Sequence, residues 1–456
     1  MRTLSQLISQ SGPSMRHRFL PVASLVVTLA GCNSLLDVNP PTQLPQEQAI
    51  TNAEGARAAL AGAYDGMQSL SYYGGDYFFF NDLYADNAIF NGTSNSFSDA
   101  DARALFADNG VILGTWSAIY TAINRDNNII QKVPPLTDMD STEKAQVVGE
   151  AYLLRALNYH NLVRVYGDVP MPLVPATSIS QASQIARTPT AAVYTQIIAD
   201  LTQAEQLISA TSPTTHATAG AAKALLARVY LYLGDDVNAI AKADEVIALG
   251  YTLAPTFGDL FDVEGVDTPE DIFKLAFSAV DFTNAGYYYI SGDNGGAGEV
   301  AVESDLIANF DVANDVRFAW SIDTLTSPAE GIKWPTTFGA EDFHIIRFAE
   351  VLLIKAEAEA HQNNLVPAVD AVNLIRVRAG LAPDTLGIQL ITQQDVLTEI
   401  ALQRRLELAF EGDRFPDLVR TGQAQTVLGI PAFRELFPIP QVEIDVAPNI
   451  TQNPGY

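Results

Sequence analysis

Apolar residues recur at three- and four-residue spacing over much of this chain, and that spacing predicts α-helices. The first run begins behind Thr51 or Asn52, either of which can cap a helix. The run at 142–166 is expected to start at Ser141 or Thr142. The same spacing predicts further helices at 111–132, 190–209, 218–233, 235–249, 342–362, 366–379 and 393–411.

Four of these helices are expected to form two antiparallel pairs. Helices 218–233 and 235–249 are joined at a Gly-Asp turn, and 342–362 with 366–379 repeats this plan. Alanine is frequent in both pairs, so the helix axes can approach closely, as in a tetratricopeptide unit. Long insertions separate the pairs, which excludes a tandem array. We predict a mainly α fold, in which tetratricopeptide-like helix pairs pack with an irregular, loop-rich lobe.

Two stretches, about 71–110 and about 250–340, interrupt the helical spacing. They are rich in glycine, aspartate, proline and threonine, and they contain clusters of aromatic residues. Long irregular insertions in a compact protein are usually functional or disordered. So many aromatic residues argue against disorder. We therefore expect these insertions to form the loops that carry function.

Aromatic residues in the insertions are candidates for a ligand surface. The C–H faces of sugar rings stack on aromatic rings, and sugar hydroxyls bond to amides and carboxylates. The alternative is core packing, since six aromatics within nine residues, 72–80, cannot all face solvent. Trp116 lies in a helical run and is expected in the core. The candidate ligand-binding residues are Tyr72, Tyr73, Asp76, Tyr77, Asn81, Tyr287, Tyr288, Asn294, Trp320 and Trp334.

The start of the chain has the pattern of a bacterial lipoprotein signal. Arg16, His17 and Arg18 precede a mostly apolar run that is too short to cross a bilayer. The chain's single cysteine, Cys32, follows Leu-Ala-Gly, which fits cleavage before a thiol that receives lipid. An ordinary secretory signal with a chance cysteine is the alternative. Translation from Met15 would give a more compact signal.

We therefore divide the chain into three parts. Residues 1–31 are expected to be the signal peptide, 32–46 a proline-containing tether, and 47–456 a single composite domain. A lipid anchor at Cys32 would attach the protein to a membrane.

The charge of the chain excludes several functions. It carries 53 acidic and 26 basic residues, and its formal net charge is −27. Such a surface repels the phosphates of nucleic acids, so we expect no DNA or RNA partner. It also repels anionic lipid, so the acyl anchor must provide membrane attachment. The same charge would repel a strongly anionic glycan at long range.

Several charged residues invite comparison with a hydrolase site, in which two carboxylates share the chemistry. Ion pairs between packed helices explain the same residues, because arginine can bridge carboxylates and Glu407 lies one helical turn from Glu411. We prefer this structural interpretation. The residues are Arg155, Arg164, Glu350, Glu357, Arg404, Arg405, Glu407, Glu411, Asp413 and Arg414.

We expect no catalytic residues, no cofactor and no metal site. The histidines do not form a metal-binding pair, and the sequence has no HExxH run. The glycine cluster at 292–298 lacks the lysine that follows in a phosphate-binding loop. Calcium between Asp259, Asp262, Glu264 and Asp267 is an open alternative, although their spacing does not match an EF-hand.

Five segments together resemble the SusD/RagB family of outer-membrane lipoproteins. Each is weak alone, but they occur in order over nearly the whole mature chain. They are CNSLLD at 32–37, EAYLLRALNYHNLVRVYGDVP at 150–170, IRFAEVLL at 346–353, RRLELAFEGDRF at 404–415, and the ending FPIP at 437–440 with QNPGY at 452–456.

The resemblance implies a binding protein without catalysis, located at the outer membrane, held by its lipid anchor and exposed at the cell surface. Members of this family lie over a TonB-dependent β-barrel transporter of the SusC type and deliver oligomeric nutrients to it, usually glycans and sometimes peptides. The ligand positions vary within the family, so the resemblance assigns none of the candidate residues. A helical-repeat scaffold that binds another protein, or a divergent hydrolase, are the alternatives.

Overall fold

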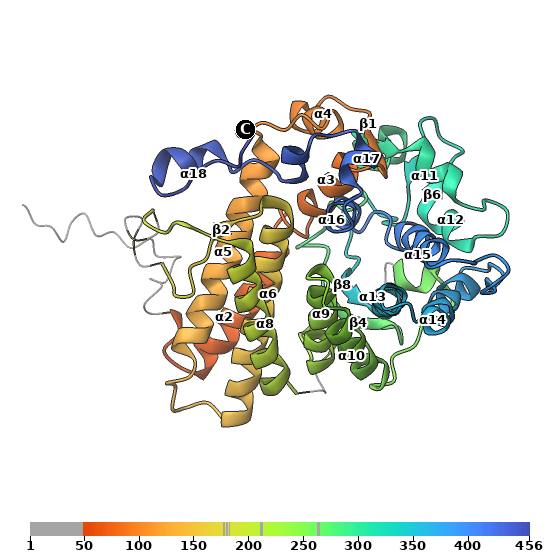
Figure 1. Cartoon of the computed structure of the whole chain (residues 1–456). Helices are drawn as coiled ribbons and strands as arrows, with labels where there is room; N and C mark the ends of the chain where they lie inside the picture. The colour runs from red at the N-terminus through yellow and green to blue at the C-terminus, as the bar shows by residue number, and fades with distance from the viewer. Residues whose placement is uncertain (1–48, 177, 179–180, 182, 210–212, 262–264) are drawn as a thin grey trace, which may run out of the picture. The chain divides into compact units, whose positions relative to one another are not determined.

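A computed structural model describes residues 49–176, 178, 181, 183–209, 213–261 and 265–456 (Figure 1). Contacts between Cα atoms group residues 46–456 into one compact unit. The predicted signal peptide, Cys32 and the tether up to residue 46 lie outside the described residues. Within the described part of the chain, no helix is long and apolar enough to cross a membrane.

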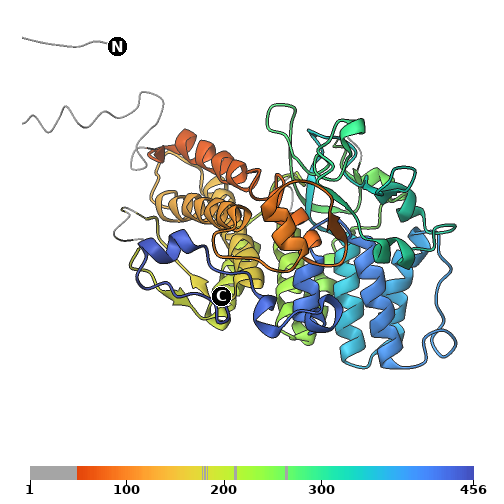
Figure 2. The same cartoon turned by 90° about the horizontal axis from the view of Figure 1, so that it is seen from above.

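In the described part of the chain, eight of the longer helices follow one another as neighbours. Contacts join α2 to α5, α5 to α6, and so on through α8, α9, α10, α13 and α14 (Figure 2). This order confirms the prediction of a mainly helical fold. The likeness to tetratricopeptide repeats stays a prediction. The helices are α2 (Ala53–Met67), α5 (Gly110–Lys132), α6 (Ser141–Tyr166), α8 (Thr190–Leu207), α9 (Ala219–Tyr232), α10 (Asp236–Ile247), α13 (Phe348–His361) and α14 (Leu365–Arg378).

Side chains at the helix starts fix these boundaries. Asn52 accepts from the backbone N–H of Gly55 at the start of α2, as predicted. At α6 the cap is Asp140, not Ser141 or Thr142, and its carboxylate accepts from the N–H of Thr142 at 2.8 Å. A carboxylate satisfies the free N–H groups and also interacts well with the helix dipole.

The predicted helix at 342–362 begins later, at Phe348. Residues Phe343–Arg347 instead form strand β8, which pairs antiparallel with β4 (Asp271–Leu275). All five residues of each strand are buried. A short buried strand and a buried helical segment look alike in a sequence, because neither alternates with polar residues.

The first insertion is more helical than predicted. Asp76–Tyr84 forms helix α3, and Asn95–Asp101 forms α4. Every residue of α3 from Tyr77 onwards is buried. Since no face of α3 meets solvent, the sequence has no amphipathic pattern from which this helix could be predicted.

The second insertion is largely irregular, as predicted, and contains short elements. Strand β5 (Val300–Val302) pairs with β1 (Ala88–Phe90), so the two insertions meet. The other short elements of this insertion are η2 (Gly258–Phe261), η3 (Gly292–Asn294), α11 (Ser304–Asn309), α12 (Val316–Ser321), β6 (Ile322–Asp323) and β7 (Glu330–Gly331). Outside the insertion, β2 (Val169–Pro170) pairs with β3 (Arg187–Thr188).

The last predicted helix ends early. Helix α15 covers Gln393–Glu407, and the chain then turns through Phe410 and Gly412, both of which have positive φ. A Cβ on Gly412 would lie 2.5 Å from the Cα of Phe78, so this turn requires glycine. The chain continues through α16 (Arg414–Arg420), α17 (Ala424–Leu428), η4 (Ala432–Glu435) and α18 (Gln441–Val446).

Candidate functional site

The first predicted aromatic cluster lies in the core. Tyr72, Tyr73 and Tyr77 are all buried, and their hydroxyls contact polar side chains of α6. Asn161 donates to the hydroxyls of Tyr72 and Tyr73 at 2.6 and 2.7 Å, and Arg164 donates to that of Tyr77 at 2.8 Å. These rings have no face open to a ligand, which argues against the prediction that they bind one.

Two more candidates are also part of the core. The indole N–H of Trp334 donates to the carbonyl of Phe410 at 2.9 Å, and its ring stacks on Phe343 with centroids 5.0 Å apart. Asn81 is buried and donates to the carbonyl of Tyr77. Burial of both side chains likewise contradicts a role at the ligand surface. As predicted, Trp116 is buried.

The remaining candidates lie in three different places. Trp320 is 50% exposed and covers Gly258. Asn294 is exposed and its amide donates to the carboxylate of Glu330. Tyr287 and Tyr288 are half-buried. These two tyrosines and half-buried Asp76, which lies beside Ser71, are near the groove described next. The structure therefore does not assemble all the predicted residues into one site.

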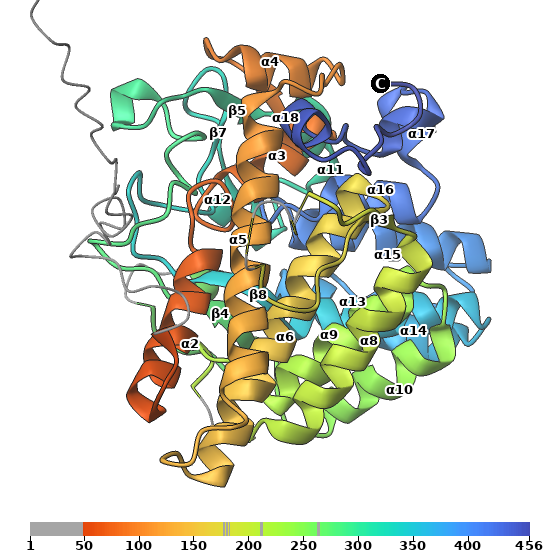
Figure 3. The same cartoon turned by 90° about the vertical axis from the view of Figure 1, so that its left-hand side faces the viewer.

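A polar groove of about 530 Å³ lies between the end of α2, the middle of α5 and the loop at 280–282. In Figure 3, α5 runs in front with α2 beside it. This volume lies within the usual range of small-molecule sites. The groove is lined by Asp65, Gly66, Gln68, Ser69, Leu70, Ser71, Gly114, Ser117, Ala118, Thr121, Arg125, Val280, Asp281 and Phe282.

Backbone hydrogen bonds hold the two loops of the groove together. The N–H of Asn284 donates to the carbonyl of Gly74 at 2.7 Å, and Thr283 exchanges backbone bonds with Gly339. The turn at 68–76 is tight, because a Cβ on Gly74 would lie 2.4 Å from the carbonyl oxygen of Gln68. Its position therefore requires glycine.

The rim of the groove carries a cluster of aromatic rings. Phe338 is 54% exposed and lies between Phe282 and Tyr287, with ring centroids 5.3 and 4.8 Å away. Tyr287 in turn contacts Tyr288, whose ring packs on Phe79 in the core. We call Phe282, Tyr287 and Phe338 the aromatic rim.

Charges at the groove are mostly negative. Arg125 lies against α2, where it donates to Asp65 at 2.7 Å and to the carbonyl of Gly62. The pKa of Asp281 is raised by partial burial and by the charge of Asp65. Burial raises the pKa of Asp76, beside Ser71, to about 6. With its one arginine paired, the groove offers hydroxyls and carboxylates to a ligand.

Sequence analysis missed most of this groove. Helix α5 contributes residues at helical spacing on the side opposite the buried Ile119 and Ile123, namely Gly114, Ser117, Ala118, Thr121 and Arg125. A solvent-facing stripe of small polar residues on a long helix is the signal that could have identified it. Phe282 and Phe338 lie in the predicted insertion, but no pattern distinguished them from its other aromatics.

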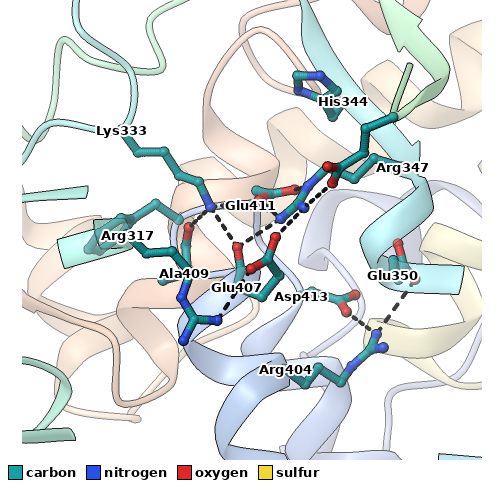
Figure 4. Close-up of polar contacts among 12 residues, drawn as sticks. Arg317, Lys333, His344, Arg347, Glu350, Arg404, Glu407, Ala409, Glu411 and Asp413 are labelled. Atoms are coloured by element: carbon teal, nitrogen blue, oxygen red, sulfur yellow. Dashed lines mark hydrogen bonds and ion pairs between the residues drawn. The ribbon is translucent and has the colours of Figure 1, made fainter. Parts of the chain in front are cut away.

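The charged residues form a buried ionic network (Figure 4). The Glu407 carboxylate accepts from Arg347 at 2.5 Å, from Arg317 at 3.3 Å and from Arg378. Lys333 donates to Glu411 at 2.6 Å and to the carbonyls of Glu407 and Ala409. The network joins α15 and its following turn to β8, α12 and α14.

A second group of charges continues the network toward α6 and α16. Arg164 donates to Asp413 at 2.9 Å, and Arg404 donates to Asp413 and Asp417. Arg228 bonds to both oxygens of Glu350. Likewise, Arg155 pairs with Asp200, Arg420 with Glu357, and Arg405 and Arg414 with Asp86. These contacts fit the structural interpretation of the charged residues.

The carboxylates of the network are poorly suited to acid catalysis. Burial alone would raise the pKa of Glu407, but the charges of Arg378, Arg347 and Arg317 outweigh it and hold the pKa well below its usual range. A general acid needs a raised pKa and access to substrate. Among the described residues, no group of histidines and carboxylates forms a metal site. Asp262 and Glu264 of the proposed calcium loop lie outside the described residues.

The network predicts sensitivity to acid. Burial would raise the pKa of Asp271, but the hydrogen bond and charge of His344, the N–H of Thr268 and the charge of Lys274 together lower it to about 2. The pKa values of Glu407 and Asp413 are also lowered, because nearby arginine charges outweigh their burial. Below about pH 4 the unfolded chain takes up these protons more readily than the folded one, so folding becomes less favourable. We expect the free energy of unfolding, from urea titrations, to fall steeply between about pH 4 and 2.

The variant Asp271→Asn removes one of these titrations and should reduce the steepness of the fall. Asp82, whose pKa is raised to about 7 by burial, is a useful internal contrast. The folded chain binds this proton more tightly than the unfolded chain, and both states are protonated only below about pH 3, so Asp82 contributes nothing to the fall in stability. A stability that does not change between pH 4 and 2 would contradict this assignment.

Two family profiles match the chain. Residues 34–231 match a family described as "Starch-binding associating with outer membrane", and residues 318–432 match one described as "SusD family". "SusD-like protein P2" of Formosa agariphila is 29% identical over an alignment of 497 positions including gaps, which covers 95% of this chain and 98% of that protein. "Starch-binding protein SusD" of Bacteroides thetaiotaomicron is 26% identical over 211 residues, 43% of this chain and 34% of that protein.

Solved structures share the fold. A SusD superfamily protein from Bacteroides vulgatus superposes with a TM-score of 0.81 at 22% identity, over 88% of this chain and 99% of that one. A protein described as a laminarin-binding SusD-like protein superposes with a TM-score of 0.79 at 27% identity, over 89% of this chain and 100% of that one.

Proposed function

Because the chain belongs to the SusD/RagB family, we propose that it captures an oligomeric nutrient at the cell surface and passes it to a TonB-dependent β-barrel transporter. It is a nutrient-binding protein of the outer membrane. Its amino-terminal part, in this proposal, consists of a signal peptide at 1–31, lipid-bearing Cys32 and a tether to residue 46. Residues 47–456 form the receptor domain.

The polar groove with its aromatic rim carries this proposal. Serine and threonine hydroxyls, with the carboxylates of Asp65 and Asp281, can exchange hydrogen bonds with sugar hydroxyls. Phe338 offers an exposed ring on which a sugar face can stack. The groove and the negative chain charge favour an uncharged oligosaccharide over an anionic one.

Relatives suggest which glycans to test first. One similar structure is described as laminarin-binding, and one relative and one family profile are described as starch-binding. A peptide is the second ligand class in this proposal. We propose no catalysis, since the carboxylates of the ionic network already have buried arginine or lysine partners.

Calorimetry of the lipoprotein in phospholipid nanodiscs, against laminarin and starch oligosaccharides and a peptide panel, tests the proposal. The expected result is binding of at least one uncharged glycan without release of shorter products. Cleavage of the glycan would favour the hydrolase instead. If neither a glycan nor a peptide binds, and only a protein other than a transporter co-purifies with the lipoprotein, the scaffold function would be favoured.

The aromatic rim gives a specific prediction. Phe338→Ala is expected to weaken glycan binding about tenfold, which corresponds to about 1.4 kcal/mol, because it removes an exposed stacking face. Phe106→Ala is the matched control, since Phe106 is 58% exposed but belongs neither to the groove nor to its aromatic rim. Equal effects of the two variants, or no effect of Phe338→Ala, would place the ligand elsewhere.

A further inference from the structure

A second cavity lies on the other side of α5. This apolar cleft, of about 470 Å³, is bounded by α5, the chain after β2 and the region of α18. Its walls are formed mainly by Tyr120, Pro172, Val446 and Ile450, and buried Trp116 contributes to its floor. Figure 3 shows α5 in front, with α2 on one side and α18 on the other.

Side chains of α5 fix the wall of this cleft. The hydroxyl of Tyr120 donates to the carbonyl of Pro170 at 2.6 Å, and the amide of Asn127 donates to that of Pro172 at 2.9 Å. The amide oxygen of Asn124 accepts from the N–H of Ala176 at 3.0 Å. These bonds give the cleft a defined shape and leave an aromatic ring, Tyr120, on its surface.

The polar groove and the apolar cleft are continuous. Ser117 and Thr121 line both of them, and both residues are exposed. They lie one helical turn apart, and the hydroxyl of Thr121 donates to the carbonyl of Ser117 at 2.8 Å. Both side chains are short, so the boundary between the two cavities is low and bears hydroxyl groups.

We propose that the apolar cleft is a second binding region for the same uncharged oligosaccharide, reached across Ser117 and Thr121. The cleft combines a tyrosine ring and aliphatic walls with polar groups at its edge, namely Asn124 and Glu443. That combination suits a sugar, which has apolar faces and polar edges. The proposal rests on the proposed function, because it assumes that the groove holds a glycan.

Chain length distinguishes the two regions. On α5 each cavity extends over about eleven residues, or about 16 Å of helix. A trisaccharide can occupy the groove alone, while a decasaccharide of the same series can also enter the cleft. We expect the decasaccharide to bind at least tenfold more tightly, measured by calorimetry with laminarin-derived and starch-derived series on the lipoprotein in nanodiscs.

Two matched substitutions on α18 test the position. Val446→Arg places a long side chain in the cleft. It should reduce the affinity for the decasaccharide to that for the trisaccharide, and it should leave the affinity for the trisaccharide unchanged. Val442→Arg is the control, since Val442 is similarly exposed on the same helix, 51% against 59%, but does not line the cleft. It should leave both affinities unchanged.

The outcomes separate this inference from the proposed function. Suppose that the trisaccharide binds as tightly as the decasaccharide and that Phe338→Ala weakens the binding of both. In that case the groove is a glycan site and the cleft is not. If the decasaccharide binds more tightly but Val446→Arg has no effect, the extra contacts lie elsewhere and the cleft is again excluded. Absence of binding by either probe removes the glycan site and its extension together.

Discussion

Glu407→Gln is expected to lower the free energy of unfolding by about 3–5 kcal/mol, the usual cost of leaving a buried charge without its partner. Glu407 is fully buried and bonds to Arg317, Arg347 and Arg378. Glutamine keeps the shape of the side chain but removes the negative charge that compensates these cations. The measurement is a urea titration of the wild type and the variant at neutral pH.

Glu143→Gln is the matched control for this result. Glu143 also pairs with an arginine, Arg57 at 2.5 Å, but both side chains are exposed to solvent. Solvent screens such a pair, so the urea midpoint should hardly change. Similar losses in the two variants would show that burial of the network has no special energetic role.

A double variant tests the cause of the loss. Arg378→Met, combined with Glu407→Gln, removes one of the three cations that have lost the charge of Glu407 and should restore part of the lost stability. Additive losses in the double variant would instead mean that packing, and not unbalanced charge, accounts for the effect.

Cys32→Ser is expected to transfer the protein from the outer-membrane fraction to the soluble fraction. Each buried CH₂ of an acyl chain contributes about 0.8 kcal/mol, and more than one chain is needed for stable attachment. The net charge of −27 cannot replace the anchor, because it repels anionic lipid. Fractionation with immunoblotting measures where the protein is, and mass spectrometry of the mature amino terminus measures whether it is acylated.

Ser34→Ala, two residues away, controls for disturbed export. It retains the thiol and should leave the protein acylated and in the membrane. An unmodified Cys32 in the wild-type protein, or a Cys32→Ser variant that remains in the membrane fraction, would contradict the lipoprotein assignment.

Sequence periodicity predicted helices that have a buried and an exposed face, such as α2 and α5. Helix α5 was expected at 111–132 and is observed at Gly110–Lys132. Periodicity did not identify α3 or β8, which are buried on all sides, because such segments lack alternation between apolar and polar residues. The turn after Glu407 was missed because a glycine in an apolar and charged run does not by itself specify positive φ.

The site was harder to predict than the fold. Tyr72 and Trp334 have the chemistry of sugar platforms, yet both are buried. A tyrosine or tryptophan suits a core equally well when its polar atom finds a partner, as these do in Asn158 and Phe410. Exposure depends on contacts between distant segments, such as 74 with 284, and a single sequence contains no direct record of them.

The backbone bonds between Asn284 and Gly74, and between Thr283 and Gly339, have a consequence for engineering. They join the loops at 74, 283–284 and 339 through main-chain atoms, and these bonds do not depend on which side chains stand at 282 and 338. New specificities can therefore be sought by randomising positions 280, 282, 287 and 338 in a library, while the surrounding scaffold keeps its geometry.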